Sequence, residues 1–307
     1  MGKLYFHILF LIISNSFIAE VYSSAKFTIV NKCQFTVWPA IWSSTGSSPP
    51  PTTGFALHTG ESRIVNAPSS WAGRFWGRMH CSEDPPGNFS CLTGDCGSGK
   101  VECGSAAAAA IPVTLAEFAL DTFNGMDFYD LSLVDGYNLP ILVAPHGRNC
   151  SETECGADLD SECPPELRVT SAGGEQVACR RPCEPFKTQR YCCSESLAAC
   201  KPTLYAQAFK RACPQAYSYA RDDGNTTFTC TGADYNITFC PPRDVSKKSS
   251  PGAGGSNTTI DGHMVYEGAV EVSSAPATYR RRGGNVAVEL SLLLLVVNTF
   301  RVGPFTG

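Results

Sequence analysis

A mainly β fold is predicted by three features of the amino-acid sequence. Short segments of alternating apolar and polar residues recur about every ten residues, separated by Gly, Pro or Asn-Gly turns. Gly and Pro are frequent, at 28 and 21 of 307 residues, which suits a loop-rich β protein better than a helical bundle. Hydrophobic residues make up 43% of the chain, enough for a sizeable core. These features together favour an antiparallel sandwich or barrel.

The first predicted strands lie near the N-terminal end of the cysteine-containing region. Residues 27–38 alternate between apolar and polar side chains and predict a pair of strands with a turn near Asn31 and Lys32. Pro39 and the Ser- and Pro-rich run that follows it predict a loop. The later predicted strands lie within residues 55–65, 71–79 and 112–143.

The segment 150–213 has a different character, because it is dense in cysteine and poor in strand patterns. Within it, residues 203–212 place apolar side chains at helical spacing. Pro202 precedes this stretch and Pro214 follows it, positions at which proline begins and ends helices. One helix is therefore predicted at 203–212, inside an otherwise loop-rich region.

The 16 cysteines all lie between Cys33 and Cys240. A metal site would need tight Cys pairs or His at ligand spacing, and none of the five His residues stands in such an array. An even number of cysteines in a secreted chain favours a complete set of eight disulfides, with no metal and no free thiol. Counting leaves the pairing open.

The N-terminus has the pattern of a signal peptide. A single Lys3 precedes the apolar segment 4–18, which is short for a membrane span. Residues 1–24 are therefore predicted to direct secretion and to be removed. Cleavage after Ser23 fits the small-residue rule best, and cleavage after Ser24 or Ala25 is an alternative.

The C-terminal part contains no cysteine after Cys240 and divides into two predicted segments. Residues 242–285 contain the polar run KKSSPGAGGSNTT and predict a flexible linker. Residues 286–307 begin with an apolar stretch that is too short for a comfortable transmembrane helix. They fit the tail of a glycolipid-anchor (GPI) signal, with attachment at Ser273 or Ser274. The alternative is a frayed extension, and the non-apolar end favours that alternative.

Charge and glycosylation motifs agree with a secreted protein. The chain has 24 basic and 28 acidic residues, a net charge of −4, which argues against a nucleic-acid partner. An acidic domain is likewise not expected to attract anionic lipids. Asn149 precedes a cysteine expected in a disulfide and is the weakest glycosylation candidate. The four predicted N-glycosylation sites are Asn88, Asn225, Asn236 and Asn257.

Several longer strings are specific enough to indicate a family. The strings WGRMHC at 76–81, CLTGDC at 91–96, DFYDLSLVDGYNLP at 127–140 and QRYCC at 189–193 resemble the signature of the thaumatin-like proteins, which include the osmotin-like and pathogenesis-related proteins. The resemblance covers residues 25–241 and every cysteine. It implies a thaumatin-like β-sandwich, a disulfide-rich helical lobe at about 156–213 and a small disulfide-stapled lobe, with a cleft between the sandwich and the helical lobe.

The resemblance also implies how the cysteines pair. The order of bridges in the family, carried onto this chain, gives Cys33–Cys240, Cys81–Cys91, Cys96–Cys103, Cys150–Cys230, Cys155–Cys213, Cys163–Cys179, Cys183–Cys192 and Cys193–Cys200.

Antifungal members of the family carry one arginine and four acidic residues around the cleft. By position in the motifs, the resemblance implies Arg74, Glu117, Asp130 and Asp135 here, with Asp223 as the fifth residue. Its neighbour Asp222 is the alternative for that last position. The alternative for the whole set is that these acids bind no ligand and are simply solvated or paired with the arginine.

The residues around these acids predict how each would behave. Glu117 has apolar neighbours in sequence, so a partly desolvated carboxyl with a raised pKa is expected, as a general acid requires. Asp135 precedes Gly136 at a predicted turn and is expected to be solvated and ionised, as suits a base or nucleophile. Asp130 and Asp135 are an odd number of residues apart, so a straight strand would separate them, whereas a strand end or bulge could bring them together.

The expected function is that of a secreted plant-type defence protein. The resemblance implies antifungal binding of β-1,3-glucan or a related fungal wall polysaccharide in the acidic cleft, by a monomer without cofactors. The alternatives are a weak endo-β-1,3-glucanase and a non-catalytic interaction protein with a structural or developmental role in the wall. Tryptophans 38, 42, 71 and 76 are candidates for stacking on sugars, with core packing the expectation for Trp38 and Trp76.

Overall fold

The computed structural model describes residues 24–104, 109–156, 162–193, 200–222 and 225–242. These residues belong to one compact unit. The predicted signal peptide, linker and C-terminal tail, with the attachment site at Ser273 or Ser274, lie outside the described residues. In the described ranges, no helix has the length and hydrophobicity needed to cross a bilayer.

One sheet has the strand order β3-β1-β13-β8-β9. Its strands are β1 (Ala25–Asn31), β3 (Ser62–Ala67), β8 (Ile141–His146), β9 (Thr153–Cys155) and β13 (Asp234–Phe239). The pair β1–β13 is parallel and the other pairs of this sheet are antiparallel. Two parallel strands end at the same edge of a sheet, so Cys33 and Cys240 meet just beyond β1 and β13 and form a disulfide.

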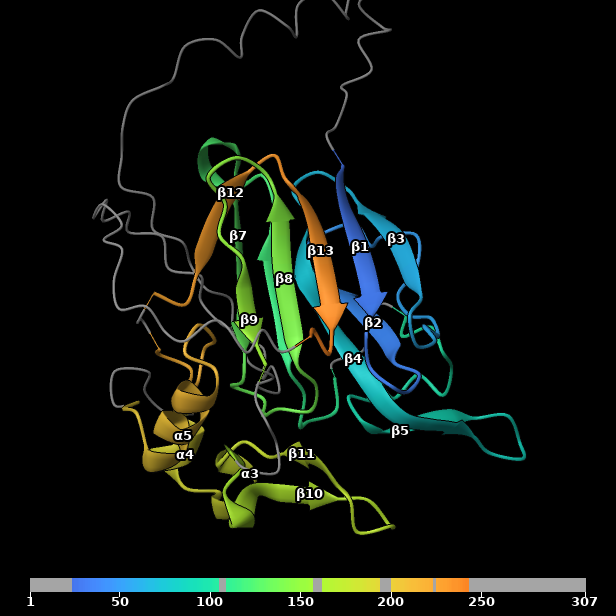
Figure 1. Ribbon diagram of the computed structural model, residues 1–307, viewed down its shortest axis with the longest axis vertical. Helices are drawn as coiled ribbons and strands as arrows, with labels where there is room; N and C mark the ends of the chain where they lie inside the picture. Colours follow the sequence, from blue (N-terminus) through green and yellow to red (C-terminus); the bar gives the residue numbers. More distant parts are fainter. Residues whose placement is uncertain (1–23, 105–108, 157–161, 194–199, 223–224, 243–307) are drawn as a thin grey trace, which may run out of the picture. The chain divides into compact units, whose positions relative to one another are not determined.

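The second sheet has the order β12-β7-β6-β4-β2 and is antiparallel. Its strands are β2 (Trp38–Ser43), β4 (Ala72–Glu83), β6 (Leu115–Ala119), β7 (Met126–Ser132) and β12 (Phe228–Thr231). The long strand β4 continues past the sheet and pairs with β5 (Phe89–Thr93), and Figure 1 shows this hairpin projecting from the sandwich.

The two sheets pack face to face through an aromatic core. Alternate residues of β1 and of β13 are fully buried, as expected for strands with one face inward. Phe27 of β1 lies 4.7 Å, between ring centroids, from Phe75 of β4, and Phe118 of β6 lies 5.1 Å from Tyr235 of β13. These contacts cross from one sheet to the other, so the predicted β-sandwich is confirmed.

A cysteine-rich lobe lies at one end of the sheets, where Figure 1 places the helices and the small sheet. It contains β10 (Arg168–Thr170), β11 (Gln176–Cys179), α3 (Cys183–Phe186), α4 (Gln189–Cys192) and α5 (Leu204–Ala212). The predicted helix at 203–212 corresponds to α5, which Thr203 caps by accepting a hydrogen bond of 3.2 Å from the backbone N–H of Ala206.

Eight disulfides hold the described residues together, and no described cysteine is free. They are Cys33–Cys240, Cys81–Cys91, Cys96–Cys103, Cys150–Cys230, Cys155–Cys213, Cys163–Cys179, Cys183–Cys192 and Cys193–Cys200. These are the same pairs that the resemblance implies.

Four details of the strand prediction were wrong. The segment 27–38 does not form a strand pair, because β1 lies in one sheet and β2 begins only at Trp38, in the other sheet. Pro39 lies inside β2 and not in a loop, which proline can do because β2 is an edge strand of the ladder. Of the segment 55–65, only the last residues form a strand, and the sandwich is not wholly antiparallel because β1 and β13 run parallel.

Candidate functional site

A row of polar and aromatic side chains crosses the outer face of the second sheet. Trp42 of β2 is registered with Arg74 of β4, Arg74 with Glu117 of β6, and Glu117 with Asp130 of β7. Neighbouring residues on these strands, such as Phe118, point into the sandwich core. Because side chains alternate along a strand, the row must lie on the opposite face of the sheet.

Arg74 is held in this row from both sides. Its Nε lies 3.3 Å from Oε1 of Glu117, and its guanidinium carbon lies 4.9 Å from the ring centroid of Trp42. The side chains of Arg74 and Glu117 are 18% and 14% exposed. The ion pair is therefore mostly shielded but still accessible from solvent, and the indole fixes the position of the cation.

Burial raises the pKa of both carboxyl groups in the row. The pKa of Glu117 rises from an ordinary 4.5 to about 7, because desolvation outweighs the opposing attraction of Arg74, and the negative charge of Asp135 adds to the rise. The pKa of Asp130 rises well above its ordinary value through desolvation and repulsion by Glu117. The raised pKa that the sequence predicted for Glu117 is confirmed.

Asp130 is the most enclosed acid of the row. It is 2% exposed, and among the described residues its Oδ1 has no hydrogen-bond partner. A buried carboxylate without partners is costly, so a protonated carboxyl is favoured at this position. Asp130 is thus suited to hold a proton next to Glu117.

Asp135 joins the group from the loop after β7. The strand ends at Ser132, and Gly136, at a φ of +94°, donates its N–H to the carbonyl of Leu133 in a turn. The turn explains how two aspartates an odd number of residues apart come together, because Asp135 no longer follows the strand. We call Arg74, Glu117, Asp130 and Asp135 the acidic cluster.

The environment of Asp135 corrects its predicted role. The sequence predicted a solvated carboxylate, but the side chain is only 7% exposed and its Oδ1 lies 3.0 Å from Nη1 of Arg181. Arg181 comes from the cysteine-rich lobe, so the ion pair joins that lobe to the sandwich. A carboxylate held this way is a poor match for a freely acting base or nucleophile.

Two residues of this junction were not predicted from the sequence. Arg181 pairs with Asp135, and Glu184 in α3 lies close enough to interact with both charges. Burial raises the pKa of Glu184, while Arg181 and Arg180 oppose the rise. No local pattern marks these residues, because the cysteine-rich lobe is brought to the cluster by the long-range fold; only the doubled arginine at 180–181 could have drawn attention.

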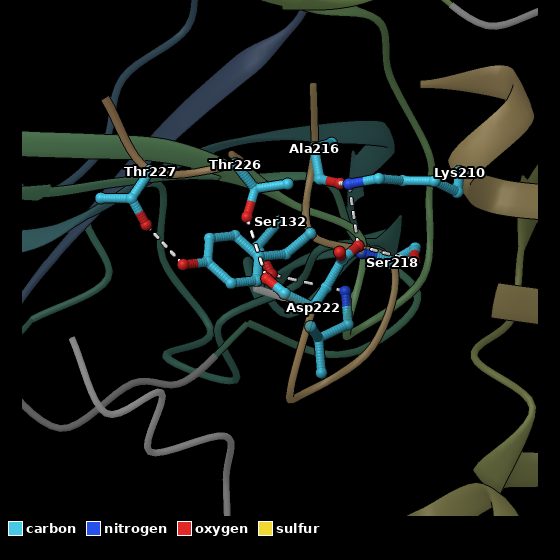
Figure 2. A network of polar contacts seen from close by, with 9 residues as sticks. Ser132, Lys210, Ala216, Ser218, Asp222, Thr226 and Thr227 are labelled. Atoms are coloured by element: carbon cyan, nitrogen blue, oxygen red, sulfur yellow. Dashed lines mark hydrogen bonds and ion pairs between the residues drawn. The ribbon is translucent and has the colours of Figure 1, made fainter. Parts of the chain in front are cut away.

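The carboxylate of Asp222 is hydrogen-bonded within the protein and is not open to solvent. Its Oδ2 accepts hydrogen bonds from the backbone N–H of Ser218 at 2.9 Å, from Oγ of Ser218 at 2.8 Å and from Nζ of Lys210 at 3.0 Å (Figure 2). Its own carbonyl accepts from Oγ1 of Thr226 at 3.0 Å. The carboxylate of Asp222 is therefore engaged by hydrogen bonds to Ser218 and Lys210. Asp223, the residue preferred from the sequence, lies outside the described residues.

The other candidates have simpler positions. Trp71 and Trp76 are fully buried, which confirms the packing role predicted for Trp76, whereas Trp38 and Trp42 are half-buried.

Asn88 and Asn225 are exposed and Asn236 is half-exposed on β13, while Asn257 lies outside the described residues. Their glycosylation stays a prediction. Among the described side chains, no group of three His, Cys, Asp or Glu residues could hold a metal ion.

This combination defines a class: a disulfide-stapled β-sandwich protein with a partly accessible acidic cluster where the sandwich meets a cysteine-rich lobe. The Thaumatin family model matches residues 31–241, and the chain belongs to the thaumatin family.

The relatives of the chain carry related names. It is 50% identical over 253 residues to Thaumatin-like protein 1 of Arabidopsis thaliana, covering 78% of this chain and 92% of that one. It is 46% identical to Pathogenesis-related protein 5 of the same plant, over 76% of this chain and 97% of that one. It is 48% identical to a PR5-like receptor kinase of A. thaliana, over 80% of this chain but only 38% of the kinase.

Among solved structures, the thaumatin-like xylanase inhibitor is 24% identical, with a TM-score of 0.39, over 70% of this chain and 99% of that one. Membership of a thaumatin-like, pathogenesis-related family supports a role in plant defence. Homologues of this kind are typically secreted, extracellular proteins.

Proposed function

We propose that this protein is a secreted defence protein that binds β-1,3-glucan or a related fungal wall polysaccharide at the acidic cluster, with an antifungal effect. The observation that carries the proposal is the row of Arg74, Glu117 and Asp130 on one sheet face, beside the half-buried Trp42. Carboxylates and a guanidinium offer acceptors and donors for sugar hydroxyls, and an indole offers a flat apolar face for a sugar ring.

The positions of the acids favour binding over catalysis. A glycosidase of the usual kind needs two carboxyl groups that flank the scissile bond, one to donate a proton and one to act as base or nucleophile. Glu117 has the raised pKa of a general acid. Asp130 is enclosed and Asp135 is tied to Arg181, so neither is free to serve as its partner.

A weak endo-β-1,3-glucanase remains the second candidate, because a carboxyl with a pKa of about 7 beside other carboxyls is the arrangement that glycoside hydrolysis uses. In that case Glu117 would be the general acid and Asp135 its partner after release from Arg181. The third candidate, an interaction protein of the plant wall without a sugar ligand, predicts no retention on any glucan.

Retention on insoluble β-1,3-glucan, measured together with the release of reducing ends, separates the three functions. The proposed function predicts retention without release. Glu117→Gln together with Arg74→Gln should weaken retention by about tenfold or more, because both the acceptor and the cation of the row are lost. If the protein is a hydrolase, Glu117→Gln alone should lower turnover by roughly 100-fold while retention persists.

The matched control is Glu83→Gln together with Arg63→Gln, which removes the same charges from exposed positions away from the cluster. This variant should be retained like the wild-type protein. Equal retention of both double variants would contradict a role for the acidic cluster in binding.

A further inference from the structure

A pocket lies where the sandwich meets the cysteine-rich lobe, next to the acidic cluster. Its lining includes Val134 from the loop after β7, Arg181 before α3, and Tyr219 from the loop that precedes Asp222. The cavity volume is about 50 Å³. A pocket of this size has room for a few water molecules or for one small charged group. The rest of a larger ligand would lie outside the pocket.

The pocket is basic, although the chain as a whole is acidic. Arg181, Arg190 and Lys201 all line it. Arg181 is balanced by its ion pair with Asp135. Arg190 and Lys201 are exposed, and among the described residues neither forms an ion pair. Two cations that form no ion pair with a described residue create a positive potential that favours an anion at this position.

The wall of the pocket also carries aromatic side chains. Tyr191 of α4 lines it, as does Tyr219. The Tyr191 ring is packed against Phe186 at 4.9 Å and Tyr205 at 5.7 Å between centroids, which fixes its orientation. A fixed tyrosine offers an apolar body and a polar tip, the combination found where proteins meet amphipathic ligands such as sugars.

We propose that this basic pocket binds the carboxylate of a uronic acid in an acidic wall polysaccharide. Arg190 and Lys201 supply the charge, since an arginine fork matches a carboxylate and a lysine adds a mobile point charge. The Asp135–Arg181 ion pair places the pocket next to the acidic cluster. The choice of a polysaccharide over an acidic peptide rests on the proposed function.

The test compares two double variants that remove the same charge from the secreted protein. Arg190→Gln with Lys201→Gln removes the pocket cations. Lys187→Gln with Arg211→Gln is the matched control, because both residues are exposed in the same lobe and do not line the pocket. Calorimetric titration with tetragalacturonate supplies the affinity, and a β-1,3-glucan tetramer serves as the neutral probe. Thermal melting establishes that all variants are folded.

We expect the pocket variant to bind tetragalacturonate about tenfold or more weakly, and the control variant to bind it within about twofold of wild type. Glucan binding should be unchanged in both. Equal weakening by the two variants, or no binding of tetragalacturonate by the wild type, would overturn the proposal. Equal binding of a glutamate tetramer would overturn its sugar specificity. Absence of glucan binding by the wild type, together with tetragalacturonate binding that only the pocket variant loses, would contradict only the proposed function.

Discussion

Glu117 and Asp130 stand directly opposite each other across the β6–β7 ladder, on the outer face of the second sheet. Directly opposed side chains on one face of a sheet are close enough for like charges to repel, and here burial adds its own cost to ionisation. Both pKa values are raised, and Arg74 only partly compensates. The two carboxyl groups therefore hold their protons to a higher pH than ordinary carboxyl groups do.

This pair predicts a pH-dependent stability. Below about pH 4.5 both the folded and the unfolded protein hold the Glu117 proton, and the folded state carries no penalty there. As the pH rises towards about 7 the unfolded chain ionises first, so the folded protein becomes progressively less stable. Compared with Glu117→Gln, the wild-type protein should lose on the order of 2 kcal/mol of unfolding free energy between these pH values.

Urea unfolding at several pH values would measure this difference. Glu83→Gln is the control, because Glu83 is exposed at the far end of β4 and should show the wild-type pH dependence. A difference between wild type and Glu117→Gln that stays constant from about pH 4 to pH 8 would contradict the raised pKa.

A second prediction concerns the ion pair between the two lobes. Arg181→Gln leaves the enclosed Asp135 carboxylate without its cation, so it should destabilise the protein more than Asp135→Asn does. The double variant should be less destabilised than the sum of the single variants, with a coupling of roughly 1–3 kcal/mol. Denaturant unfolding of the four proteins supplies this coupling, and a value near zero would mean that the pair does not hold the lobe to the sandwich.

The sequence allowed the sandwich and most of the acidic cluster to be predicted, for identifiable reasons. Strand alternation depends on local residues, so the pattern in residues 27–31 predicts that Phe27 and Ile29 face the core. Family strings of high specificity supplied Arg74, Glu117, Asp130 and Asp135, which the fold brings together. The raised pKa of Glu117 was predicted from its apolar neighbours, of which only Leu115 shares its face of the sheet, because Ala116 and Phe118 pack in the sandwich core.

Contacts between distant segments were not predictable in the same way. The alternation in residues 27–38 could not reveal that β1 and β2 enter different sheets, because sheet membership depends on partners far along the chain. Asp135 was expected in solvent because its ion-pair partner, Arg181, is far away in the sequence. The basic pocket likewise combines residues from several separate segments.

A third prediction concerns the disulfides. The Cys33–Cys240 bridge closes a separation of 207 residues, and the Cys96–Cys103 bridge one of 7. In the chain-entropy account, replacing both cysteines by alanine should cost about 5 kcal/mol for the long loop and about 2 kcal/mol for the short one. Urea unfolding of the two variants tests the order of these costs. Thiol labelling of the denatured, unreduced wild-type protein should add nothing.

A fourth prediction concerns the C-terminal segments, which lie outside the described residues. If residues 286–307 are a glycolipid-anchor signal, the mature chain ends near Ser273 or Ser274. A phosphatidylinositol-specific phospholipase should then release the protein from membranes. Mass spectrometry of the mature protein should find no peptide containing Leu292–Leu295, and recovery of such a peptide would contradict the anchor.

The last prediction separates Asp222 from Asp223. Asp222 is 6% exposed, and its carboxylate accepts from Lys210 and twice from Ser218. Asp222→Asn keeps the shape but removes the charge that these donors face, so it should lower the unfolding free energy by roughly 1–3 kcal/mol. Asp234→Asn is the matched control, because Asp234 pairs with Lys26 at a similar distance, 3.1 Å, but at the surface, where such a pair contributes little.

Asp223→Asn should give the opposite pattern, because Asp223 is the residue expected to contact a ligand: stability close to wild type, and weaker retention on β-1,3-glucan. Denaturant unfolding and glucan retention, measured on the same three variants, distinguish the two aspartates. If Asp222→Asn weakened retention without loss of stability while Asp223→Asn destabilised the fold, the assignment of the fifth cleft residue would have to move to Asp222. The half-buried Lys210–Asp222 pair would then lie in the ligand site, where its carboxylate could bind sugar hydroxyls instead of Lys210.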